Sequence, residues 1–176
     1  MESQRNFLTI EEAKKLFATP CPNLLVRKIS MFSVLTGIRY VDIANLKWSE
    51  ICFAENEGHY VAFRQKKTEG VVSLPISEEA FGLLGKRRGQ NEKVFKNLNK
   101  WDVDRSLPVW LELSGIKKHI TFHCFRHTYA TLQLTAGTDI FTISKMLGHR
   151  SVKTTQIYAK VVDQKKRDAA NRISLE

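Results

Sequence analysis

Residues 51–77, ICFAENEGHYVAFRQKKTEGVVSLPIS, decide the fold class of this chain. Apolar and polar residues alternate along the stretch, which is rich in β-branched and aromatic side chains, as strands of a half-buried sheet are. The alternation is interrupted by an acidic run with glycine at 55–58 and by a basic run at 66–70. Runs of this kind are typical of hairpin turns. The stretch therefore predicts three antiparallel strands joined by two turns.

Helical patterns precede this sheet. Thr9 and Glu12 have the spacing of a capping box, which predicts a short helix to about residue 17. A second helix is predicted from Asn23 to Gly37, where glycine suits a left-handed helix end. Its apolar stripe consists of Leu25, Ile29 and Phe32. A further short helix is expected over residues 41–46.

After the sheet, Ser77 is expected to cap a helix that ends near residue 84. The basic, loop-rich residues 85–100 predict a connector, and this is the one place where we expect a hinge. Residues 101–113 have a helical pattern that contains Pro108. Because proline removes a helical hydrogen bond, we expect a kink there or two short helices.

The last part of the chain reads as helices throughout. Thr121 is expected to cap a helix whose core face carries Phe122, Phe125, Tyr129 and Leu132. A helix over 138–147 ends at Gly148, another begins at Ser151 and carries Tyr158, and a charged helix follows over 161–173. The predicted fold class is α+β, a mainly α-helical domain with a small three-stranded antiparallel sheet.

The charge of the chain indicates its partner. There are 28 Lys and Arg residues against 18 Asp and Glu, a net charge of +10. Such an excess favours nucleic acid, because cationic side chains displace condensed counterions from a phosphate backbone. A basic protein that is merely soluble is the alternative. No long basic amphipathic helix stands out, so we do not expect binding to a membrane surface.

Localisation and redox state follow from other absences in the sequence. No apolar run approaches the ~20 residues that span a bilayer, and the first residues, MESQRNFLTI, lack a signal-peptide pattern. We therefore expect a cytoplasmic protein. The three cysteines lack C-x-x-C spacing and are expected to be free thiols rather than zinc ligands: Cys21, Cys52 and Cys124.

Two pairs of polar residues are candidates for phosphate binding. His123 and Arg126 stand three positions apart on one helix, off its apolar stripe, where they form either a phosphate cradle or a solvated pair. Arg39 follows the end of an apolar helix and needs an acidic partner, which Asp42 can supply. A surface pair of that kind contributes about 1 kcal/mol or less.

Three further residues complete the candidate set. Lys67 lies in the second hairpin turn, where lysines are common. His149 follows the helix-ending Gly148, and Tyr158 lies nine positions further on, outside the clearest core pattern. Both residues also have a non-catalytic interpretation. His149 would then be a surface histidine beside a helix cap, and Tyr158 a half-buried aromatic residue.

Taken together, these residues supply two guanidiniums, an ammonium, two imidazoles and a phenol. The sequence shows no close carboxylate cluster for Mg²⁺, since the side chains of Asp102 and Asp104 diverge on a helix. A free phenol has a pKa of ~10, so it needs a base or cationic surroundings to attack near neutral pH. The set suits an attack on a phosphodiester without a metal or another cofactor.

Four stretches in this order resemble the tyrosine recombinases, the phage-integrase type of site-specific recombinase. The resemblance covers roughly residues 9–173, and its C-terminal motifs are similar to integrases of mobile elements in the Bacteroides group. The stretches are TGIRYVDIANLKW (36–48), QKKTEGVVSLPI (65–76), HCFRHTYATLQL (123–134) and LGHRSVKTTQIYAKV (147–161). The resemblance implies the catalytic-domain fold of that family and DNA recombination.

The resemblance also implies a role for each residue. Arg39 and Arg126 would bind the non-bridging oxygens of the scissile phosphate, and Tyr158 would be the nucleophile that forms a 3′-phosphotyrosine link. Lys67 would protonate the leaving 5′-oxygen, although Lys66 is an alternative. His123 would assist proton transfer at the tyrosine, His149 would donate a hydrogen bond to the phosphate, and Asp42 would orient Arg39. Basic residues expected to contact DNA are Arg64, Lys66, Lys67, Arg150 and Lys153.

Two positions depart from the family pattern: Cys124-Phe125 stands where Asp-Leu is frequent, and Asp42 where Glu is common. Only 38 residues precede Arg39, too few for the core-binding domain that usually comes first. We therefore expect residues 1–176 to be a single catalytic domain, monomeric alone and with weak DNA affinity.

The expected partner is double-stranded DNA, bound by a homotetramer of the full-length protein, with DNA-bending or excision factors as further candidate partners. A non-catalytic DNA-binding regulator and a type IB topoisomerase-like enzyme are the alternatives to a recombinase.

Overall fold

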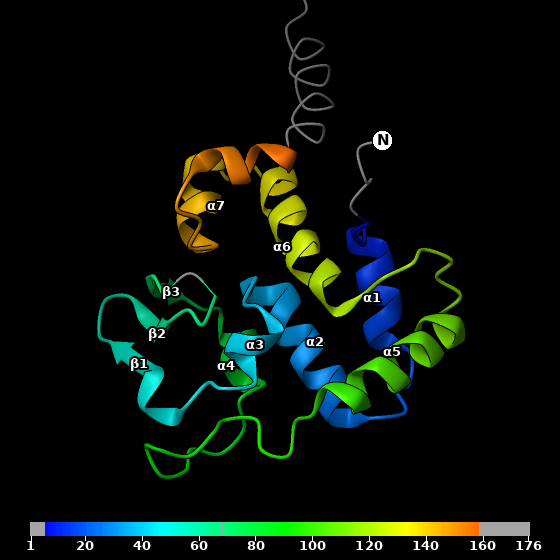
Figure 1. Ribbon diagram of the computed structural model, residues 1–176, viewed down its shortest axis with the longest axis horizontal. Helices are drawn as coiled ribbons and strands as arrows, with labels where there is room; N and C mark the ends of the chain where they lie inside the picture. The colour runs from blue at the N-terminus through cyan, green and yellow to red at the C-terminus, as the bar shows by residue number, and fades with distance from the viewer. Residues whose placement is uncertain (1–5, 68, 159–176) are drawn as a thin grey trace, which may run out of the picture.

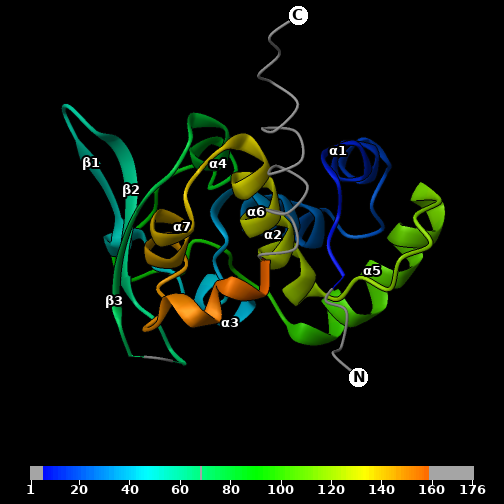
Figure 2. The same cartoon turned by 90° about the horizontal axis from the view of Figure 1, so that it is seen from above.

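The computed structural model describes residues 6–67 and 69–158. Helices form most of it, and a small sheet lies on the side opposite α1 and α5 (Figures 1 and 2). The helices are α1 (Ile10–Ala18), α2 (Leu24–Thr36), α3 (Tyr40–Ile43), α4 (Glu78–Gly82), α5 (Lys100–Ser114), α6 (Phe122–Ala136) and α7 (Ile140–Met146). Short 3₁₀ turns are η1 (Trp48–Glu50), η2 (Val152–Thr154) and η3 (Gln156–Tyr158), and the strands are β1 (Ile51–Ala54), β2 (Gly58–Arg64) and β3 (Val71–Pro75).

The sheet has the order β1-β2-β3 with both pairs antiparallel, as predicted. Val61 of β2 lies opposite Ile51 on one side and Leu74 on the other. All three side chains are buried. Because successive side chains of a strand point to opposite faces, this row defines the inner face of the sheet. The α+β prediction, a mainly helical domain with three antiparallel strands, is confirmed.

The centre of the molecule is formed by α2 and α6, which pack against each other (Figures 1 and 2). Phe32 and Phe125 are fully buried there. Phe122 and Tyr129 are also buried, as their stripe on α6 predicts, whereas Leu132 is half-buried. Since so much of α6 is enclosed, its side chains are held in place on several sides.

The helix ends predicted at Thr9, Asn23, Gly37 and Ser77 are confirmed, whereas the helix predicted over 41–46 is α3, which ends at Ile43. Thr9 caps α1, with its N–H donating to Oε2 of Glu12 at 2.8 Å and its Oγ1 accepting from the N–H of Glu12 at 3.2 Å. Asn23 caps α2, which ends at Gly37 with φ +71°, and Ser77 caps α4. Local polar chemistry therefore sets these boundaries.

Two helix predictions were wrong, namely the alternative of two short helices at Pro108 and the single helix from Ser151 to Tyr158. α5 runs unbroken through Pro108, which lies on the exposed face, where water can bind the carbonyl that proline leaves unpaired. Residues 151–158 form the two turns η2 and η3 instead of one helix. Tyr158, which the sequence left outside the core pattern, is buried at the end of η3.

The connector between α4 and α5, where a hinge was predicted, lies against the body of the protein. Arg87 donates to the carbonyls of Ile51 and Trp48, and the N–H of Val94 donates to the carbonyl of Leu46. Two of its apolar side chains, Val94 and Phe95, are buried. These contacts hold the connector along η1. The helix predicted over 161–173 lies outside the described residues.

Candidate active site

Arg126 is the most enclosed of the candidate residues. The sequence placed it on a polar face, but its side chain is only 4% exposed. Its Nη1 donates to the carbonyl oxygen of Gly37 and its Nη2 to that of Leu147, both at 2.7 Å. These two residues are the C-caps of α2 and α7. Because helix C-termini carry partial negative charge, both ends stabilise the guanidinium.

The charge of Arg126 persists despite this burial. Burial lowers the pKa of Arg126 to about 10, and the neighbouring Arg39 cation acts in the same direction. The site therefore holds a cation at neutral pH at a place where desolvation opposes it. An anion that binds here would interact strongly with the buried guanidinium, since charge interactions are stronger away from water.

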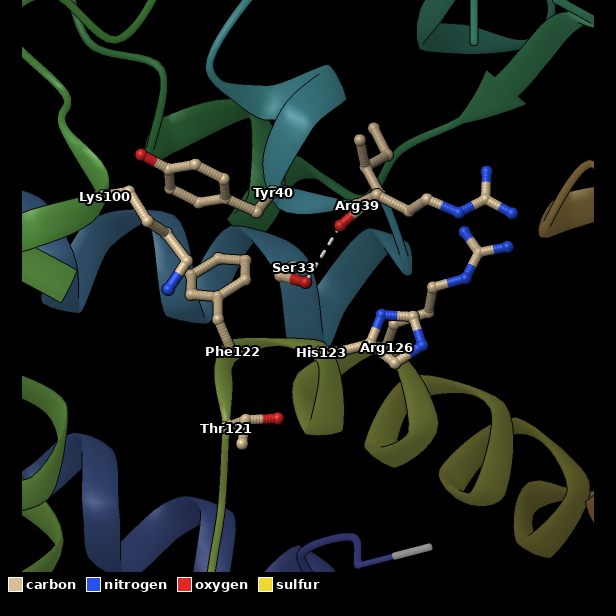
Figure 3. Close-up of a pocket in the computed structure, with 9 residues that line it drawn as sticks. Ser33, Arg39, Tyr40, Lys100, Thr121, Phe122, His123 and Arg126 are labelled. Atoms are coloured by element: carbon tan, nitrogen blue, oxygen red, sulfur yellow. Dashed lines mark hydrogen bonds between the residues drawn. The ribbon is translucent and has the colours of Figure 1, made fainter. Parts of the chain in front are cut away.

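Arg39 lies beside Arg126. It follows Gly37 at the start of α3, and the two guanidiniums are neighbours in Figure 3. Burial lowers the pKa of Arg39, while the charge of Asp42 opposes this shift. Nη1 of Arg39 is buried and has no hydrogen-bond partner among residues 6–67 and 69–158. A buried, unpaired N–H of a cation is suited to an oxygen of a bound phosphate.

A pocket of about 200 Å³ opens at these two arginines (Figure 3). The exposed His123 borders it from the first turn of α6. His123 and Arg126 are therefore not a solvated pair. His123 borders the pocket and is exposed, whereas Arg126 is buried. The other lining residues are Ser33, Ile38, Tyr40, Lys100, Thr121 and Phe122.

Asp42 connects this pair to the second hairpin turn. Its buried Oδ1 accepts the backbone N–H of Lys66 at 2.8 Å. The neighbouring Gln65 side chain, also buried, donates to the carbonyl of Leu147 at 3.1 Å. The turn that carries Lys66 and Lys67 is therefore fixed at its base, while both lysine side chains are exposed. Asp42 thus positions the turn and also favours the charged form of Arg39.

Replacing Asp42 by alanine is expected to destabilise the protein by about 1 kcal/mol, because the N–H of Lys66 loses its acceptor. Amide hydrogen exchange should show faster exchange at Lys66. Asp42→Asn retains an acceptor oxygen and should retain the protection. Asp104→Ala is the matched control, since that carboxylate is exposed and pairs with Lys100 of its own helix. Unchanged protection of Lys66 in Asp42→Ala would contradict this assignment.

His149 and Tyr158 are carried by the segment after α7. Gly148 has φ +63°, and the N–H of His149 donates to the carbonyl of Ser144 at 2.9 Å. The Nδ1 of His149 lies 2.8 Å from Oγ1 of the buried Thr155. Two turns later the Tyr158 side chain is 6% exposed. The charge of Tyr158 acts on the pKa of Arg126, so phenol and guanidinium are close.

The structure thus brings together most of the predicted set. Arg39, His123 and Arg126 border one pocket, Tyr158 is within electrostatic range of Arg126, and Asp42 holds the base of the lysine turn. The basic residues predicted to contact DNA are exposed: Arg64, Lys66, Lys67, Arg150 and Lys153.

One residue that sequence reasoning missed is His127. Its Nδ1 lies 2.6 Å from the hydroxyl oxygen of Tyr158. The signal was present in HCFRH, because a second histidine four positions after His123 lies on the same helix face.

The fold is that of tyrosine recombinase catalytic domains. The catalytic domain of bacteriophage HP1 integrase matches with a TM-score of 0.71 and 24% identity, over 98% of this chain and 97% of that one. XerA recombinase matches with a TM-score of 0.74 and 26% identity, over 98% and 65%. XerH site-specific recombinase, bound to a palindromic difH substrate in a post-cleavage complex, matches with a TM-score of 0.76 and 21% identity, over 96% and 53%.

The sequence comparisons agree. The phage integrase family profile matches residues 6–165. Tyrosine recombinase XerA of Pyrococcus furiosus is 32% identical over 96% of this chain and 62% of its own length. A tyrosine recombinase of Agathobacter rectalis is 34% identical over 76% of this chain and 46% of its own length. This chain belongs to the phage integrase family. It spans less than two thirds of the length of these relatives.

Proposed function

We propose that this chain is the catalytic domain of a site-specific DNA recombinase of the tyrosine type, which integrates or excises a mobile element. Family membership supports the proposal. The observation that carries it is the pair of neighbouring guanidiniums, of which Arg126 is fixed by two helix ends and Arg39 retains an unpaired buried N–H. A nearby buried phenol, Tyr158, supplies the nucleophile.

Binding of the scissile phosphate follows from this geometry. The free N–H of Arg39 and the outer edge of Arg126 donate to its non-bridging oxygens, and the planar guanidiniums suit the charge that develops during attack. Because Arg126 is already held by protein carbonyls, little reorganisation accompanies binding. The net charge of +10 attracts the DNA, and the exposed basic residues predicted to contact DNA bind its backbone.

Cleavage is then a transesterification. The phenolic oxygen of Tyr158 loses its proton and attacks the phosphorus, and the bond to the 5′-oxygen breaks as Lys67 protonates that oxygen. His149 donates a hydrogen bond to the phosphate, and His123 assists proton transfer. The 3′-phosphotyrosine link conserves the phosphodiester, so attack by a 5′-hydroxyl rejoins DNA without ATP and without a metal or cofactor.

The assembly belongs to the same proposal. The full-length protein would bind double-stranded DNA as a tetramer, with accessory bending or excision factors as further partners. The isolated domain would be a monomer. No helix within 6–67 or 69–158 is long and apolar enough to cross a membrane. A cytoplasmic location is part of the proposal.

Tyr158→Phe in the full-length protein is expected to abolish the covalent protein–DNA adduct, because the ring stays in place while the attacking oxygen is removed. The measurement is a denaturing gel after incubation with a nicked suicide substrate, which traps the phosphotyrosine. Tyr60→Phe, in strand β2, is the matched control and should form the adduct like the wild type. An adduct of equal yield with Tyr158→Phe would refute the assignment of the nucleophile.

The same preparation separates the alternatives. A regulator that only binds DNA would give a gel shift and no adduct in any condition. An enzyme of the type IB topoisomerase kind would form the adduct and relax supercoiled DNA, but would not join strands from two duplexes. A recombinase gives both the adduct and the exchanged product.

A further inference from the structure

We propose that His127 is a further catalytic residue, which binds the hydroxyl of Tyr158 and accepts its proton during cleavage; this rests on the proposed function. The Nδ1 of His127 lies 2.6 Å from the Tyr158 hydroxyl oxygen. The two side chains are 7% and 6% exposed. Among the described residues this contact joins an imidazole directly to the atom that would attack DNA.

The position of His127 is set by α6. It follows Arg126, which is anchored by two carbonyls, so the backbone at this point of α6 is fixed. One turn earlier His123 meets it edge-on, with ring centroids 4.6 Å apart. The Tyr158 ring lies 5.8 Å from it, centroid to centroid, at an interplanar angle of 55°. The imidazole thus lies between the pocket-lining histidine and the phenol.

The direction of this hydrogen bond depends on the tautomer of His127. A neutral imidazole has one nitrogen that accepts and one that donates. With the imidazole proton on Nε2, Nδ1 accepts from the phenol O–H, and this is the tautomer that the proposal requires. In this tautomer the nucleophile already donates to the group that can remove its proton.

The chemical step balances. As the phenolic oxygen bonds to phosphorus, its O–H bond breaks and the proton moves to Nδ1 of His127. The bond from phosphorus to the 5′-oxygen breaks, and that oxygen takes a proton from the lysine of the hairpin turn. The phosphate bound at Arg39 and Arg126 brings the negative charge that compensates the imidazolium. On rejoining, Nδ1 returns its proton to the departing Tyr158 oxygen.

The two histidines of α6 therefore have different positions and different proposed roles. His123 is exposed and borders the pocket where the phosphate binds. His127 is buried and faces the nucleophile. His127 therefore accepts the proton of Tyr158 in this chain, and His123 keeps its assisting role from the side of the pocket.

The test compares His127→Asn with His127→Leu in the full-length protein. The two replacement side chains have nearly the same shape, and the Asn amide can occupy the Nδ1 position and hydrogen-bond to the phenol, but it cannot take up a proton. Single-turnover cleavage of the suicide substrate should slow at least about 10²-fold in both variants, the range of general acid–base contributions. A wild-type rate in either variant overturns the proposal.

A second substrate distinguishes the nucleophile from the leaving group. When sulfur replaces the bridging 5′-oxygen, the leaving group needs no protonation. The defect of both His127 variants should persist on this substrate, because the phenol still has to lose its proton. Recovery of the wild-type rate would overturn the proposal, because it would assign His127 to the leaving group.

A DNA-free measurement separates this proposal from the proposed function. Thermal unfolding of wild type, His127→Leu, Tyr158→Phe and the double variant forms a mutant cycle. Each single variant should lower Tm by about 2–4 °C, and the double variant by less than the sum, because both lose the same bond. Additive losses would overturn the proposal even if DNA is cleaved. If the wild type forms no adduct, the proposed function fails whatever the cycle shows.

Discussion

Arg126→Lys is expected to slow DNA cleavage by about 10³-fold, the upper range for removing one donor to a developing charge. The guanidinium donates to two carbonyls, those of Gly37 and Leu147, and Arg126 also lines the pocket. An ammonium is a compact charge without this planar fork. Lysine can therefore satisfy one carbonyl or the phosphate, but not all three at once.

The lost carbonyl contact has its own cost. A buried carbonyl without a donor is expected to lower the free energy of unfolding by about 1–3 kcal/mol. Arg105→Lys is the control, because that arginine lies on the exposed side of α5, stacked on Trp101. Cleavage rates and denaturant unfolding of both variants check the prediction. Cleavage within tenfold of the wild type for Arg126→Lys would show that a charge alone suffices at this position.

Gly37→Ala is expected to cost about 3–5 kcal/mol of folding stability, from backbone strain and from overpacking together. Gly37 has φ +71°, where any side chain is strained. A Cβ there would lie 2.5 Å from Cδ1 of Tyr129 and 2.8 Å from Cδ2 of Leu147. The tyrosine ring is buried and rigid, so it cannot move aside cheaply. Because the Gly37 carbonyl binds Arg126, the distortion should reach the phosphate site as well.

Gly85→Ala provides the matched control for this effect. Its φ of +78° imposes the same kind of strain, but nothing lies within 4 Å of the added Cβ. It should lose only about 1–2 kcal/mol. Urea unfolding of the two variants therefore separates strain from overpacking. Equal losses in the two variants would show that the contact with Tyr129 is relieved by a small shift.

The parts of the fold that local chemistry controls could be predicted from the sequence. The alternation in 51–77 gave the three strands, because each strand has one buried face. Thr9 and Asn23 gave helix starts, because their side chains bind backbone N–H groups within three residues. Pro108 misled the prediction, since its effect depends on whether water can reach the carbonyl left unpaired, which the sequence does not show.

The residue types of the site could be predicted from the sequence, but the hydrogen bonds that hold these residues in place could not. Arg126 was identified, but its burial was not, because its partners are backbone carbonyls 89 and 21 positions away. Carbonyl groups occur at every residue, so they leave no pattern in a sequence. His127 was missed for a related reason: its partner Tyr158 is reached through the turns η2 and η3, where one helix was predicted.

A single oxygen atom, the Leu147 carbonyl, accepts hydrogen bonds from both Gln65 and Arg126. Gln65 begins the turn that carries the lysines. The phosphate-binding Arg126 and the base of this turn are therefore bonded to the same carbonyl oxygen. The separation between Arg126 and the base of that turn is set when the chain folds, before any substrate arrives. The entropy of aligning them is then lost during folding rather than at each encounter with DNA, and the energy of DNA binding remains for deforming the substrate.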